Sequence, residues 1–235
     1  MTCDVIATGS TGNAVLLNGT VLIDCGVPHN KIEPYVGALR LVLLTHCHGD
    51  HFNRATVRRL NQERPTLRFG CCKWMLPMLI SAGVEPRCID LMQPGAGYLY
   101  GSTLTVSPVL LSHDVENCGW IINQDGERAI YATDTGTMDG VEAKGFDLYM
   151  IEANYTEAEM EERIRRKTES GEFMYEYRAA AGHLSREQAD AWLAENATPG
   201  KSRVIFLHGH QEKQRKEERE NGDTNNLCSS VENRW

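Results

Sequence analysis

Short runs rich in apolar residues, separated by polar or glycine-containing turns, recur along the chain. In its first third they cover residues 4–7, 14–17, 21–24 and 41–44. Such short runs, bounded by turn signals, are typical of buried strands. Asn18-Gly19, between the second and third runs, predicts a hairpin turn. The first third is therefore predicted to be rich in β-strands.

Longer amphipathic stretches alternate with further apolar runs downstream. Residues 53–64 and 73–82 are predicted helices, and Pro77 predicts that the second is kinked or shortened. The remaining runs are predicted strands: residues 66–69, 103–109, 119–123, 129–133, 146–151 and 204–207.

Two capping boxes predict where the later helices begin. In this motif a Ser or Thr side chain and a Glu or Gln three residues later satisfy the first backbone N–H groups of a helix. Thr156 with Glu159 is one such pair, and Ser185 with Gln188 is the other. Blocks of strands with interspersed helices predict an α/β fold, in which two mixed β-sheets are flanked by helices.

Length and composition fit one large domain. The chain has 235 residues, 41% of them apolar, and no apolar run approaches the ~20 residues of a membrane helix. We expect one domain over residues 1–210 and a charged tail of unknown role over residues 211–235. The N-terminus shows no export signal and no Cys-x-x-Cys motif occurs, so a cytoplasmic protein with reduced thiols and no membrane partner is expected. The net charge of −8 argues against a general nucleic-acid coat protein.

The segment that directly follows the run 41–44 carries the clearest chemistry. His46, His48, Asp50 and His51 lie within six residues, in Thr45-His46-Cys47-His48-Gly49-Asp50-His51. Alternating histidines on an extended segment point to the same side. Asp50 and His51 can then reach a second metal nearby. This spacing predicts a metal site on the loop that leaves a strand.

Three more candidate ligands stand at predicted strand ends. His113, Asp134 and His208 each follow an apolar run, which is how a fold delivers dispersed ligands to one edge of its sheets. Imidazole and carboxylate together suit zinc, manganese or iron. His210 is an alternative to His208, which is preferred because it directly ends its strand.

In these ligands, and in their order, the chain resembles the metallo-β-lactamase superfamily of binuclear metallohydrolases. The resemblance is closer still to the YycJ/WalJ-like group, and it implies an αββα sandwich. The segments that carry this closer resemblance are Gly9-Ser10-Thr11-Gly12-Asn13, Leu22-Ile23-Asp24-Cys25-Gly26, Ser112-His113-Asp114, Thr133-Asp134-Thr135-Gly136, Glu152-Ala153-Asn154-Tyr155 and Gly182-His183-Leu184-Ser185.

The resemblance implies two divalent metal ions, Zn²⁺ or Mn²⁺, and a ligand set. In this set one ion is held by His46, His48 and His113. The other is held by Asp50, His51 and His208, and Asp134 bridges the two ions. Asp24 is either a turn carboxylate or the partner that orients a ligand histidine.

The implied activity is phosphodiester hydrolysis through a metal-bridging hydroxide, in the form of a 5′-to-3′ DNA exonuclease. Asp50 and His183 are the candidate catalytic residues. His183 contacts the scissile phosphate or assists the leaving group, or is simply a surface histidine before a helix. The expected partner is nucleic acid, DNA rather than RNA. The alternatives are a small-molecule hydrolase acting on a cyclic phosphodiester, thioester or lactam, and a metal-bound scaffold without turnover.

Overall fold

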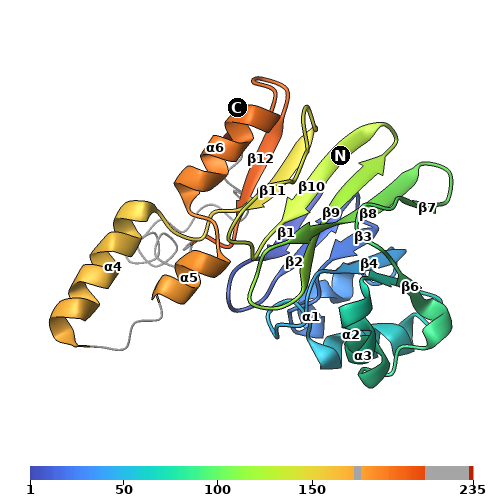
Figure 1. The fold of residues 1–235 in the computed structure, drawn as a ribbon. Coiled ribbons are helices and arrows are strands. Elements are labelled where there is room, and N and C mark those ends of the chain that lie inside the picture. The colour runs from blue at the N-terminus through green and yellow to red at the C-terminus, as the bar shows by residue number, and fades with distance from the viewer. Residues whose placement is uncertain (172–175, 210–232, 235) are drawn as a thin grey trace, which may run out of the picture.

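The computed structural model describes residues 1–171, 176–209 and 233–234. Two β-sheets face each other in these residues, and helices cover their outer faces (Figure 1). This confirms the predicted αββα arrangement. The predicted boundary at residue 210, the alternative ligand His210 and nearly all of the predicted tail lie outside the described residues.

The first sheet has six strands in sequential order, and its last four run parallel. Its first three strands form two successive antiparallel pairs. The strands are β1 (Cys3–Ala7), β2 (Ala14–Leu17), β3 (Val21–Ile23), β4 (Leu41–Leu44), β5 (Arg68–Cys71) and β6 (Ile89–Leu91).

The second sheet has seven strands, of which β10, β11 and β12 are parallel and the others antiparallel. In order across the sheet they are β13 (Asn233–Arg234), β12 (Arg203–Leu207), β11 (Leu148–Glu152), β10 (Glu127–Ala132), β9 (Asn117–Gln124), β8 (Leu104–Leu111) and β7 (Tyr98–Tyr100). Both sheets are therefore mixed.

Strand β4 shows why its sequence is apolar at every position. Leu41 and Leu43 pack between the two sheets, whereas Val42 and Leu44 face the helices outside the first sheet. Side chains alternate along a strand, so a strand covered on both faces must be apolar throughout. Each buried Leu or Val contributes about 1.5–3 kcal/mol through burial.

Helices α1, α2 and α3 cover the first sheet, and α6 packs on the second (Figure 1). Both predicted capping boxes are present at the starts of α4 and α6. None of the described helices is long and apolar enough to cross a membrane. The helix bounds are α1 (His29–Ile32), α2 (Arg54–Glu63), α3 (Leu76–Ser81), α4 (Glu157–Ser170), α5 (Glu176–Gly182) and α6 (Arg186–Asn196).

Two local predictions need correction. The strand expected at residues 66–69 is β5, at Arg68–Cys71, because Leu67 closes a turn onto Arg64 before the strand begins. The helix expected at residues 73–82 starts as a 3₁₀ turn, and α3 begins at Leu76 with Pro77 in its first turn. Proline is tolerated there because its missing N–H has no helical partner.

Gly26, just beyond β3, fixes how closely the loop after β4 approaches the first sheet. A Cβ atom at this position would lie 1.7 Å from the carbonyl oxygen of Asp50. The neighbouring Cys25 donates its backbone N–H to His51 and accepts one from Asn53, at 2.9 and 2.7 Å. Only glycine allows the two backbones to run this close.

We predict that Gly26→Ala displaces the loop of residues 46–51 and lowers the free energy of unfolding by about 3 kcal/mol. Gly37→Ala is the control, because a Cβ there meets nothing within 4 Å. Thermal unfolding of both variants measures the difference. Equal midpoints for the two would contradict the close approach.

Candidate metal centre

The loop after β4 is anchored by the buried carboxylate of Asp24. Thr45 donates to it through its backbone N–H at 3.0 Å and its hydroxyl at 2.9 Å. Trp74 Nε1 donates to the Thr45 carbonyl oxygen at 3.0 Å. Three hydrogen bonds therefore fix the position of Thr45, the residue that precedes His46, and so the start of the histidine-containing loop.

His46, His48 and His113 form one group. Each offers a ring nitrogen, and these atoms lie within 4.8 Å of one another. His113 arrives from the end of β8, and its Nδ1 donates to the Gly182 carbonyl oxygen at 3.0 Å. Because that bond occupies Nδ1, the other nitrogen of His113 is directed toward His48, at 3.4 Å.

Asp50, His51 and His208 form a second group whose ligand atoms also lie within 4.8 Å. Asp50 Oδ2 is 3.7 Å from Nε2 of both His51 and His208. His51 Nδ1 donates to Asp24 Oδ2 at 2.7 Å. The carboxylate of Asp24 therefore orients the His51 ring while it anchors the loop, which is how a partner of a ligand histidine acts.

Asp134 lies between the two groups. It forms a cluster of its own with His46 and His51, one residue from each group. Its Oδ2 is 2.7 Å from His51 Nε2, and its Oδ1 is 3.7 Å from His208 Nε2. A carboxylate that faces both groups can bridge two cations.

The chemistry of these side chains fits divalent cations. Within the described residues, Nε2 of His46 and Nε2 of His208 are buried and have no hydrogen-bond partner. Burial, followed by the nearby His51, lowers the pKa of His46 to about 2, so this ring is neutral and its nitrogen lone pair is available. Imidazole and carboxylate donors suit Zn²⁺ and Mn²⁺.

His51 and Asp134 each stabilise the charged form of the other. Burial disfavours charge on His51, but Asp24 and Asp134 outweigh it and raise its pKa well above the usual value. Burial likewise opposes charge on Asp134, yet His51 outweighs it and holds its pKa well below the usual value. Without a cation, His51 is therefore a protonated link between two carboxylates.

His183 joins the cluster, through a residue to which the sequence analysis gave no role. The fully buried Glu152, at the end of β11, places Oε1 2.5 Å from His183 Nδ1. Glu152, His183, Asp134 and His208 also form a donor group within 4.8 Å. The signal was present in the sequence, because Glu152 follows an apolar run just as the predicted ligands do.

His208 leaves β12 with a φ of 59°. Its backbone N–H donates to the Thr8 hydroxyl at 2.8 Å, and its Nδ1 lies 3.0 Å from Asn154 Nδ2. These contacts aim Nε2 toward Asp50 and Asp134. The structure therefore brings together the predicted candidates that lie within the described residues: His46, His48, Asp50, His51, His113, Asp134, His183 and His208.

A family profile described as the beta-lactamase superfamily domain matches residues 20–208 of this chain. The chain belongs to the beta-lactamase superfamily. The match runs from the strand before Asp24 to the last histidine of the cluster, so it spans the whole candidate centre.

Solved structures of this superfamily's fold resemble the chain along nearly its whole length. Human tRNase Z, short form, has a TM-score of 0.66 at 16% identity, covering 91% of this chain and 94% of its own. Zn²⁺-bound PqqB from Methylobacterium extorquens has 0.62 at 13%, covering 89% of each. A diphosphatase of the PhnP family has 0.59 at 14%, covering 97% and 92%. No curated protein matches the sequence.

We predict that metal binding near neutral pH releases protons. His51 must be neutral to coordinate a cation through Nε2, and its raised pKa keeps it protonated in the metal-free protein. Apparent metal affinity therefore rises with pH up to that pKa. Calorimetric titration of Zn²⁺ in buffers of different ionisation enthalpy measures the protons released.

Asp24→Asn removes one charge that raises the pKa of His51, so fewer protons are released. It also weakens metal binding about 10- to 100-fold through the lost orientation of the ring. Asp147→Asn, whose carboxylate accepts a backbone N–H far along the second sheet, is the control. A binding enthalpy independent of the buffer would contradict the protonated state of His51.

Proposed function

We propose that the chain is a binuclear metal-dependent phosphodiesterase acting on nucleic acid. Superfamily membership together with the donor cluster supports a metal-dependent hydrolase. The observation that carries the binuclear assignment is the position of Asp134 between two groups of three donors. In this proposal His46, His48 and His113 would hold one cation, Asp50, His51 and His208 would hold the other, and Asp134 would serve both.

The residues around these cations have distinct tasks. A pair of divalent cations supplies Lewis acidity toward a phosphoryl oxygen and lowers the pKa of a water molecule. Asp50, which is partly exposed, accepts a proton from that water in our proposal. Burial raises the pKa of Asp50, but the nearby His208 and His51 rings outweigh that effect and lower it, so Asp50 is ionised.

His183 is the proposed proton donor to the leaving oxygen. Burial lowers its pKa, but the hydrogen bond and charge of Glu152 outweigh that effect and raise it. The ring is therefore protonated over a wider pH range than a free histidine. Its Nδ1 is engaged by Glu152, which leaves Nε2 to contact a phosphate or a leaving group.

Nucleic acid is proposed as the substrate for two reasons. Two proteins that share the fold are named as a tRNase and a diphosphatase, and both names denote enzymes whose substrates contain phosphoryl groups. The segments that resemble the YycJ/WalJ-like group favour a DNA exonuclease acting 5′-to-3′, with Zn²⁺ or Mn²⁺ as the cations.

We predict that the metal-loaded protein releases nucleotides from DNA ends, and that His48→Ala lowers the rate by at least about 100-fold. The His48 side chain is 36% exposed, so its loss leaves the fold intact. His29→Gln is the control, because His29 pairs with Glu63 on the helical side of the first sheet. Equal rates for His48→Ala and wild type would remove His48 from the site.

A panel of substrates tests which class of compound the protein hydrolyses and from which end it cleaves DNA. It contains single- and double-stranded DNA, RNA, a cyclic phosphodiester, a thioester and a β-lactam. Hydrolysis of DNA from the 5′ end is the expected result. A folded, metal-loaded protein that cleaves the thioester or the lactam and no nucleic acid would establish the small-molecule alternative, and one that cleaves none would establish a scaffold.

We predict that Glu152→Gln moves the alkaline limb of the kcat profile to lower pH. The protonated form of His183 is present below its pKa and lost as pH rises through it, and removal of the Glu152 charge lowers that pKa. A pH–rate profile of the two proteins measures the shift. An unmoved alkaline limb with a reduced plateau would show that Glu152 only supports the fold.

A further inference from the structure

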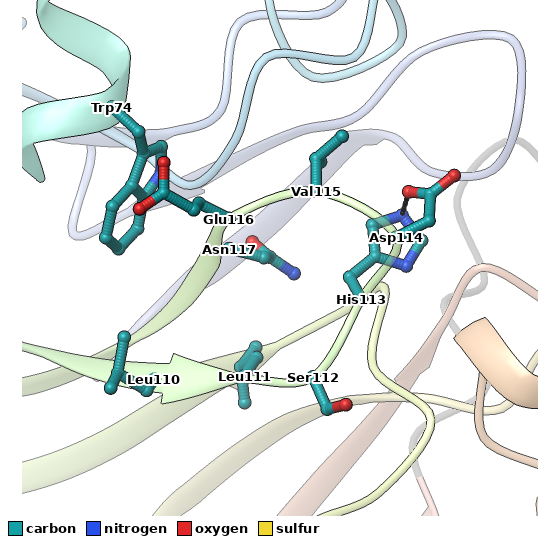
Figure 2. A pocket seen from close by; sticks show the side chains of 9 residues that line it. All are labelled: Trp74, Leu110, Leu111, Ser112, His113, Asp114, Val115, Glu116 and Asn117. Carbon is teal, nitrogen blue, oxygen red and sulfur yellow. Dashed lines mark ion pairs between the residues drawn. The ribbon is translucent and has the colours of Figure 1, made fainter.

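A pocket of about 450 Å³ opens beside the histidine cluster, between the turn from β8 to β9 and the loop after β5. Its volume lies in the range of pockets that hold small ligands. Figure 2 shows Trp74 and Leu110 on one side and His113 and Asp114 on the other. Because His113 lines both the pocket and the donor cluster, whatever fills the pocket lies directly beside the reacting bond.

One wall of the pocket offers a fixed aromatic ring and exposed apolar surface. Trp74 is held by its hydrogen bond to the carbonyl of Thr45, the residue before His46. Leu110, which lines the same pocket, is 60% exposed. Rigid aromatic and apolar surface next to a reactive site favours a flat, apolar group.

The opposite wall and the rim are acidic. Asp114 Oδ1 is 3.2 Å from His113 Nε2 and 3.5 Å from His48 Nε2, so this carboxylate stands at the boundary between pocket and cluster. Glu116 adds a second exposed carboxylate to the lining. Ionised carboxylates accept hydrogen bonds but cannot donate them, and they repel phosphate. The pocket therefore suits a group that carries N–H donors and no negative charge.

We propose that this pocket binds the nucleobase attached to the scissile phosphate, stacked on Trp74 and Leu110. A nucleobase is flat, uncharged and carries N–H donors, which matches all three properties of the pocket. The proposal rests on the phosphodiesterase function above and names the part of the substrate that the site recognises. Because every base has an aromatic face, stacking recognises a base without selecting its sequence.

The acidic rim also determines on which side of the cluster the rest of the nucleic-acid chain can lie. A second phosphate cannot follow the base into the pocket, since Asp114 and Glu116 would repel it. The nucleic-acid chain must therefore leave the cluster on another side, and the pocket holds a single terminal nucleoside.

The test compares binding of adenosine 3′-monophosphate and ribose 3-phosphate to the Mn²⁺-loaded protein by calorimetry. The two probes share sugar and phosphate and differ by the base. We expect adenosine 3′-monophosphate to bind about tenfold tighter or more, as for one stacked base. Leu110→Ala reduces this ratio several-fold and leaves binding of the probe without a base unchanged, whereas Trp74→Ala reduces the ratio and also removes the hydrogen bond to Thr45.

Leu99→Ala is the matched control, because Leu99 is an exposed leucine, 66% accessible, that does not line the pocket. If Trp74→Ala does not fold, the ratio of probe affinities in Leu110→Ala tests the proposal, because Leu110 is exposed. Equal binding of both probes to the wild type would overturn the proposal, as would an unchanged ratio in Leu110→Ala.

Hydrolysis of methyl 4-nitrophenyl phosphate, a phosphodiester without a base, separates this proposal from the function on which it rests. Turnover of that ester with equal binding of the two probes would reject the base pocket alone. Absence of turnover on any phosphodiester would reject the proposed function, whatever the binding ratio.

Discussion

The buried carboxylate of Asp24 is the interaction on which the rest of the centre depends. It accepts from the Thr45 backbone and hydroxyl, from His51 at 2.7 Å and from the Tyr131 hydroxyl at 3.0 Å. Tyr131 belongs to the second sheet, so one fully buried group ties both sheets to the loop. A buried charge is tolerated only when hydrogen bonds replace its hydration, and here those bonds are the ones that place the loop.

The backbone is strained at three strand ends, where side chains of the centre turn toward one another. Asp24, Asp134 and His208 have φ values of 58°, 56° and 59°, in the left-handed region that side chains with a Cβ rarely adopt. Each costs on the order of 1 kcal/mol or more. The sheets around them offset this cost through burial, and in return the three side chains turn toward one edge. Strain concentrated at these positions is typical of a functional site.

The sequence predicted most of the fold because its strands are covered on both faces, as in β4 and β11. It missed β6 and β7, which are three residues each and only partly buried, so no apolar run marks them. It found the donors that follow apolar runs but assigned no role to Glu152, whose partner His183 lies 31 residues away. Pairings of this kind depend on how sheets pack, and no local pattern encodes them.

The charges of the centre bear on the proposal that this acidic chain acts on a phosphate ester. Asp24, Asp50, Asp134 and Glu152 surround the histidines, and the whole chain carries a net charge of −8. Without cations these carboxylates repel a phosphodiester, whereas two divalent cations reverse the local sign. In the proposed function these carboxylates would make substrate binding conditional on the cations. Cation binding would come first, and the acidic rim at Asp114 would then confine the phosphate to the centre itself.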